Sequence, residues 1–223
     1  MPIGSVEDAL ALLQARGVVA LTALPPLVSL VEQVAGRAVP GSWWSHARGG
    51  DIYRIANELE DHAEVLVAKL VGGKVTFVHA CLWPALYRVV TDAGWRAAAL
   101  ATASPAARRV LDAVSASGPL RFDTWLAGIP AAHRAASRKA KDEIDKGMLA
   151  RAAQVHTSAG RHATVLSSWE SWAAPDTVAA AARLDLATAR SVLAEATLGL
   201  PTPCTSQRVP ACAGATRSRR HRG

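Results

Sequence analysis

The sequence has few cysteines, few aromatic residues other than tryptophan and no long apolar run. Its three cysteines form neither an even disulfide framework nor a paired metal spacing, so we expect Cys81 to pack in a core and Cys204 and Cys212 to be tail thiols. No stretch reaches the roughly 18 apolar residues of a membrane helix. Acidic Glu7 and Asp8 near the start are unlike a signal peptide. These absences predict a cytoplasmic protein without a membrane segment.

Catalytic and cofactor motifs are also missing. The chain has no GxxxxGK[ST] phosphate loop, HExxH, CxxC or nucleophile elbow. Among its scattered histidines, only His156 and His162 are expected to face each other, and no third ligand follows at a metal-binding spacing. From the sequence we therefore assign no catalytic residue, no metal and no cofactor, which weighs against an enzyme.

What the chain does have is positive charge in two places. Its formal net charge is +7, divided as −1 over residues 1–103, +5 over 104–168, −2 over 169–200 and +5 over 201–223. Apolar residues make up 50% of the 223, enough for the cores of two small domains. A localised excess of cations indicates where a polyanion would bind, and here it favours residues 104–168 and the tail.

Residues 104–168 are expected to fold as three helices and a hairpin. Ser104 and Pro105 are typical of a helix start, and glycines at 118, 128 and 147 are typical of helix ends. We predict helices over 104–118, 123–128 (capped by Asp123) and 131–146, followed by strands over 149–156 and 162–166. In the third helix, Ala136, Ala140 and Ile144 are expected to face the core.

This order resembles the winged-helix family of helix-turn-helix proteins over roughly 65 of the 223 residues. In that family the third helix usually lies in the DNA major groove and the hairpin loop, or wing, touches the backbone. The resemblance implies a DNA-binding set of Arg134, Ser137, Arg138 and Lys141 on the helix and Arg161 on the wing. The alternative interpretation is a solvated basic face, since many winged helices bind only protein.

The first half repeats this order. We predict helices over 5–16, 25–35 and 49–61, and a hairpin of 65–70 and 74–78 around Gly72-Gly73. Its third helix carries Arg54 against four carboxylates and would be repelled by phosphates. Lys69 and Lys74 beside the turn would form a second wing, or would merely keep an edge hairpin soluble.

A loop with unusual chemistry precedes that acidic helix. It contains Trp43, Trp44, His46 and Arg48 among three glycines. The composition suits a site that stacks a base and holds a phosphate. The alternative is that a tryptophan plugs the core while His46 and Arg48 are solvated.

The expected fold is mainly α with short β-hairpins (α+β), as tandem winged helices. We divide it into domains 1–80 and 104–168, a linking helix in 81–103, a C-terminal helix in 169–200 and a disordered basic tail, 201–223. Trp83, Tyr87 and Trp95 are expected to pack in the core or between domains. The C-terminal helix would pack back on the domains or on a second copy.

Double-stranded DNA is the expected partner, bound by a transcriptional regulator or nucleoid-associated factor, with a homodimer suiting a two-fold site. Two alternatives stay open. One is a glycosylase-like DNA-repair enzyme using the loop of Trp43, Trp44, His46 and Arg48. The other is a protein-interaction module that binds a protein partner through the acidic first half.

Overall fold

The computed structural model describes residues 2–156 and 162–199, which form an α+β fold with two small antiparallel sheets. The first half consists of α1 (Val6–Arg16), β1 (Val18–Ala20), α2 (Leu30–Ala35), the 3₁₀ turn η1 (Trp43–Ser45), α3 (Gly49–Glu60), β2 (Val65–Val71) and β3 (Lys74–His79). The second half consists of α6 (Pro105–Ser117), β4 (Leu120–Arg121), α7 (Phe122–Gly128), α8 (Ala131–Lys146), β5 (Arg151–His156) and β6 (His162–Ser167).

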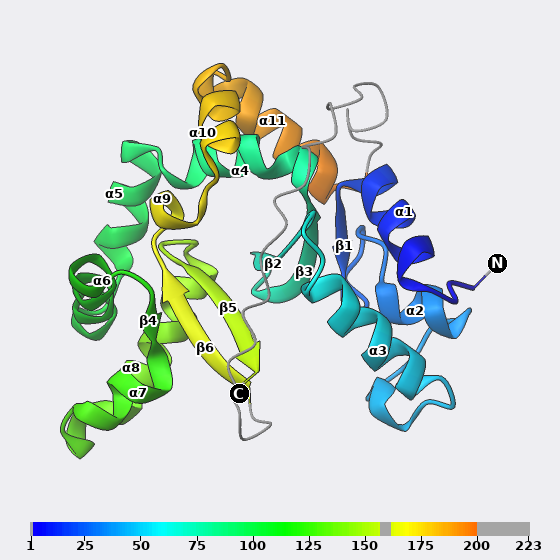
Figure 1. The fold of residues 1–223 in the computed structure, drawn as a ribbon, viewed down its shortest axis with the longest axis horizontal. Coiled ribbons are helices and arrows are strands. Elements are labelled where there is room, and N and C mark those ends of the chain that lie inside the picture. Colours follow the sequence, from blue (N-terminus) through cyan, green and yellow to red (C-terminus); the bar gives the residue numbers. More distant parts are fainter. Residues whose placement is uncertain (1, 157–161, 200–223) are drawn as a thin grey trace, which may run out of the picture.

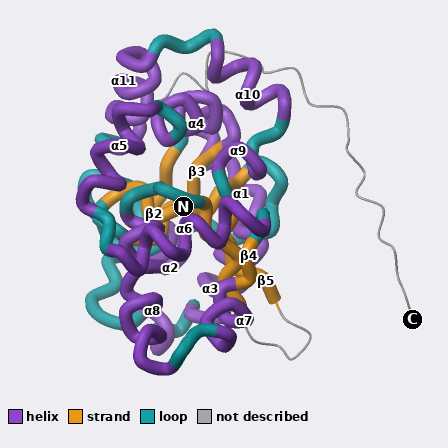
Figure 2. Tube along the Cα trace, turned by 90° about the vertical axis from the view of Figure 1, so that its left-hand side faces the viewer, coloured by secondary structure: helices purple, strands orange, loops and turns teal. Residues whose placement is uncertain are grey.

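The remaining elements connect and cover the two halves. They are the 3₁₀ turn η2 (Ala80–Leu82), α4 (Trp83–Val90) and α5 (Ala93–Thr102) between the halves, and α9 (Trp169–Trp172), α10 (Pro175–Ala182) and α11 (Leu186–Thr197) after them. Figure 1 shows the halves side by side, with α4, α10 and α11 along one end of the molecule. Figures 1 and 2 both place α7 and α8 at the opposite end.

Both halves have the same order of elements and the same sheet topology. Each runs helix, strand, helix, helix, strand, strand, apart from the short turn η1. The strand orders are β1-β3-β2 and β4-β6-β5, so the last strand of each half lies between the other two and pairs antiparallel with both. The repeat of element order expected from the sequence is therefore present.

Local capping chemistry explains several helix starts. The Ser5 hydroxyl accepts a hydrogen bond from the N–H of Asp8, and the Ser104 hydroxyl accepts one from the N–H of Ala107. Gly72 and Gly73 adopt φ values of +56° and +69°, as the tight turn between β2 and β3 requires.

Several predicted boundaries are wrong. The linking segment 81–103 forms two helices, α4 and α5, instead of one, because α5 starts anew with the side chain of Asp92 as its cap. The second helix begins at Leu30 instead of residue 25, because the chain forms a turn at Pro25–Pro26 and then pairs with the end of β1, where the N–H of Ala20 donates to the carbonyl of Val28. Asp123 does not cap α7 but lies in its first turn, where it pairs with Arg121. The C-terminal segment 169–200 forms three helices instead of one: the short α9 comes first, the chain turns after Ala182 at the end of α10, and α11 starts anew with the side chain of Asp185 as its cap.

Side chains of the first sheet alternate between two cores. Val19 and Phe77 face the core built with α1, α2 and α3, whereas Val18 and Val78 face the core built with α4 and α11. Ala189, Leu193 and Ala196 of α11 are buried in this second core, and so the C-terminal helix packs back on its own chain.

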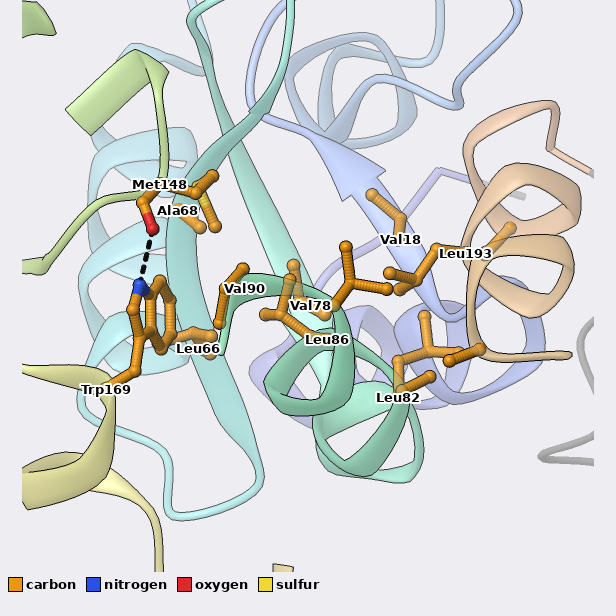
Figure 3. Packing of buried hydrophobic residues seen from close by; sticks show 14 of the residues in the cluster. Val18, Leu66, Ala68, Val78, Leu82, Leu86, Val90, Met148, Trp169 and Leu193 are labelled. Atoms are coloured by element: carbon orange, nitrogen blue, oxygen red, sulfur yellow. Dashed lines mark hydrogen bonds between the residues drawn. The ribbon is translucent and has the colours of Figure 1, made fainter. Parts of the chain in front are cut away.

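Trp169 extends that core towards the second half. Its side chain is 2% exposed, and its indole N–H donates to the carbonyl of Met148, 2.7 Å away, as Figure 3 shows. Met148 follows α8 and packs in the same cluster as Leu66 and Leu86. The link between α8 and β5 is thereby fixed to the first sheet and to α4.

Three single-residue expectations differ in outcome. Trp83 and Tyr87 pack against the core built with α4 and α11, as expected. Trp95 is 37% exposed on α5, so its assignment to packing is wrong. Cys81 also packs against that core, and it is disulfide-bonded, which the sequence interpretation missed. No helix within residues 2–156 and 162–199 is long and apolar enough to cross a membrane.

Candidate nucleic-acid interface

The core-facing side of α8 is the predicted one at two of its three positions, Ala140 and Ile144, but not at Ala136. Ser137, Ala140 and Ile144 are buried, and Ala136 is exposed. Ser137 tolerates burial because its hydroxyl donates to the carbonyl of His133, 3.0 Å away, and so satisfies its polar atom within the helix. At 1% exposure, Ser137 cannot contact a groove, and its assignment to the DNA-binding set is wrong.

Arg134 holds the turn between α7 and α8. Its Nε donates to the carbonyl of Ile129 at 3.1 Å, and its Nη2 donates to the carbonyl of Ala127 at 3.0 Å. These carbonyls lie at the end of α7, where cations are favoured. With two donors used in this way, Arg134 positions α8 instead of presenting its guanidinium to a ligand.

Lys141 and Lys69 belong to one cluster of charges on the C-terminal half of α8. Lys141 Nζ lies 3.5 Å from Asp142 Oδ1, and Lys69 Nζ lies 2.8 Å from Asp145 Oδ2 and 4.0 Å from Asp142 Oδ1. Lys69 thus reaches from β2 of the first half to the third helix of the second half. The expectation that Lys69 belongs to an exposed wing is wrong.

Two adjacent cations are available on the outer face of α8. Arg138 and Lys139 are exposed, and neither has an ion-pair partner among the residues that the structure describes. Ala131 and Ala135, which are small and exposed, lie on the same side towards the start of the helix. Sequence reasoning missed Lys139 because it assigned Ala136, and not Ser137, to the buried face of the helix.

The wing of the second half can be placed only in part. The hairpin that carries it is present, since β5 and β6 pair antiparallel from Arg151 with Ser167 to His156 with His162. Arg161 and the rest of the loop 157–161 lie outside the described residues. A contact of Arg161 with phosphate remains a prediction.

In the first half, Arg48 is a structural residue. Its Nε lies 2.9 Å from Asp51 Oδ2, and its Nη1 donates to the carbonyl of Val34 at the end of α2. The backbone N–H of Arg48 donates to Nδ1 of His46 at 3.1 Å. These bonds fix the loop between α2 and α3, so the guanidinium of Arg48 is not offered to a phosphate.

The aromatic residues of this loop separate into a packed and an exposed one. Trp43 packs against the first core, as the alternative interpretation predicted, and its ring stacks on that of Trp44 at 3.9 Å. Trp44 is 63% exposed and lies 5.5 Å from the ring of Tyr53 on α3. Tyr53 was missed because only the loop, and not the helix after it, was searched for aromatic residues.

The third helix of the first half differs from α8 in charge. The guanidinium of Arg54 pairs with Glu58 at 3.2 Å and donates to the carbonyl of Gly4. Arg54 is the only cation within α3, whereas Asp51, Glu58 and Glu60 all lie on it. This surface would repel a phosphate backbone, in agreement with the sequence analysis.

Comparison with known proteins finds no family model, no curated protein and no solved structure that matches this chain.

Proposed function

We propose that the protein is a tandem winged-helix protein that binds duplex DNA through its second half, as a transcriptional regulator or nucleoid-associated factor. The repeated order of elements and the matching strand orders β1-β3-β2 and β4-β6-β5 support the tandem assignment. Each half ends in a hairpin after its third helix, which is where a winged helix carries its wing.

The observation that carries the proposal is the outer face of α8. Arg138 and Lys139 are exposed there without an acidic partner among the described residues, and small side chains beside them permit close approach of a groove. The core of the second half holds the opposite face through Ala140 and Ile144. A rigid helix with unpaired cations on its free side suits insertion into the major groove.

The first half would support this contact without entering a groove itself. Its acidic α3 and the exposed aromatic pair of Trp44 and Tyr53 suit a protein partner better than a nucleic acid. The tail, with five arginines and no carboxylate in residues 201–223, would add salt-sensitive affinity that is independent of DNA sequence.

The test is binding of a random duplex of about 25 base pairs, measured by fluorescence anisotropy across a salt series. The association constant K falls as salt rises, and we expect this dependence to become shallower in the double variant Arg138→Glu with Lys139→Glu. The slope of log K against log salt should shrink in magnitude by about two, because about one counterion is released per phosphate contact. The control is Arg183→Glu with Arg190→Glu, which changes the net charge equally at two exposed cations, one at the end of α10 and one within α11.

Two outcomes contradict the proposal. Absence of duplex binding by the wild-type chain at low salt would remove the DNA-binding function. An equal effect of the α8 pair and the control pair would remove α8 from the interface. Replacing the five tail arginines with glutamine in every variant separates the contribution of the tail from that of the folded halves.

A further inference from the structure

The turn between β2 and β3 lies against the C-terminal end of α8, although 73 residues separate Gly73 from Lys146. A Cβ built on Gly73 would come within 3.0 Å of Lys146 Cε and 3.2 Å of Lys146 Cγ. The aliphatic part of the lysine therefore lies over the turn. The hairpin of the first half and the third helix of the second half meet at this point.

A partly buried ion pair fixes this contact. Lys69 Nζ and Asp145 Oδ2 are 2.8 Å apart, with side-chain exposures of 27% and 12%. Charges that are mostly removed from water interact more strongly than surface pairs, provided that each keeps its partner. The pair therefore favours one position of β2 relative to α8.

Two exposed lysines lie next to this contact, one from each half. Lys74 follows the turn, and Lys146 ends α8; neither has an ion-pair partner within the described part of the chain. Lys139 lies seven residues before Lys146, which places it on the same helix face about 10 Å away. The cations thus run from Arg138 and Lys139 along α8 to Lys146 and then cross to Lys74 of the first half.

The carboxylates near this row are engaged elsewhere. Asp142 lies within 4.0 Å of Nζ of Lys69 and Lys141, and Asp145 pairs with Lys69. Glu143 accepts a hydrogen bond from the N–H of Ser104 at 3.1 Å, where it helps to start α6. Asp142 and Asp145 are thus paired with lysines, whereas Glu143 keeps its negative charge beside the row. Since Arg138, Lys139, Lys146 and Lys74 outnumber this single carboxylate, the row keeps a net positive charge.

We propose that the two halves build one continuous phosphate-binding surface, in which the β2–β3 turn of the first half serves as a wing beside the C-terminal end of α8. Lys74 and Lys146 would contact the DNA backbone next to the groove that Arg138 and Lys139 enter. This inference rests on the proposed function.

The experiment uses the full chain with the same duplex and salt series. Lys74→Glu alone is expected to lower the salt slope by about one, and Lys74→Glu with Lys146→Glu by about two. Affinity at about 0.1 M salt should fall about tenfold for each lysine. Circular dichroism and urea unfolding should match the wild type, since both side chains are exposed.

The outcomes separate this inference from the proposed function. If reversal at Arg138 and Lys139 weakens binding but reversal at Lys74 has no more effect than the matched change Arg183→Glu, the second half binds DNA alone and the shared surface is wrong. If the wild-type chain binds no duplex, the proposed function itself fails. A loss for Lys146→Glu without one for Lys74→Glu also overturns the inference, because the first half then contributes nothing.

Discussion

Lys69 Nζ lies 2.8 Å from Asp145 Oδ2, and this ion pair joins strand β2 of the first half to helix α8 of the second. The Asp145 side chain is 12% exposed, and Lys69 is its ion-pair partner within the described residues. The position of the third helix in the second half is therefore tied to the hairpin of the first half.

The first prediction concerns this pair. Lys69→Met should lower the free energy of unfolding by about 1–3 kcal/mol, because it leaves a buried carboxylate without a counter-charge. Adding Asp145→Asn should recover part of that loss in a double-mutant cycle. Urea unfolding followed by circular dichroism gives the measurement.

The control for that cycle is Lys141→Met. Lys141 lies 3.5 Å from Asp142, whose side chain is 56% exposed, so water can replace the lysine. We expect a change within about 0.5 kcal/mol. Equal costs at positions 69 and 141 would mean that the ion pair does not hold the halves together.

Arg134 and Arg138 should have opposite phenotypes, although they are one helical turn apart. Arg134→Ala removes the donors to the carbonyls of Ala127 and Ile129 and should destabilise the fold by about 1–2 kcal/mol. Arg138→Ala should change stability by less than about 0.5 kcal/mol but weaken duplex binding. Thermal unfolding and anisotropy on the same samples distinguish the two; a stability loss at Arg138 would contradict the assignment.

Glycine substitutions in the β2–β3 turn test its contact with α8. Gly72→Ala meets no atom within 4 Å and should cost only the strain of a positive φ, about 1 kcal/mol. Gly73→Ala bears the same strain and also displaces Lys146, so it should cost more. The excess should disappear when Lys146 is replaced by alanine, as measured by urea unfolding, and its persistence would place the clash elsewhere.

Stability should depend on pH through His79. Burial lowers the pKa of His79 in the folded chain below its ordinary value of 6.5; nearby His62 adds to this shift, and Glu64 opposes it. The unfolded chain therefore binds more protons below pH 6.5. Stability that is fully present above pH 6.5 should be lost as the pH falls from 6.5 through the lower pKa of the folded state.

The matched variant is His79→Asn, which can still accept the hydrogen bond that His79 Nδ1 receives from the N–H of Cys81. Its unfolding free energy should vary less between pH 6.5 and 5 than that of the wild type. His133→Asn, at an exposed position, should retain the wild-type dependence. An unchanged slope for His79→Asn would show that other groups cause the pH dependence.

The order of elements could be predicted from the sequence because its signals are local. Ser5 and Ser104 cap helices through bonds to residues three positions away, and Gly72-Gly73 specifies a turn through its own backbone freedom. The charge difference between α3 and α8 is likewise a property of composition. None of these features depends on a distant part of the chain.

The candidate site could be predicted only in outline, because the role of a cation depends on what lies near it in space. Ser137 and Arg134 form hydrogen bonds with nearby carbonyls. Arg138 and Lys139 of α8 instead remain exposed and without an ion-pair partner within the described residues. Lys69 is paired with a carboxylate 76 residues away, and the turn at Gly73, next to Lys74, lies against Lys146. Sequence alone determined which segments form helices and hairpins and where positive charge gathers. Tertiary structure decided which of those charges are paired and which face solvent, because that choice follows from long-range packing that no local spacing encodes.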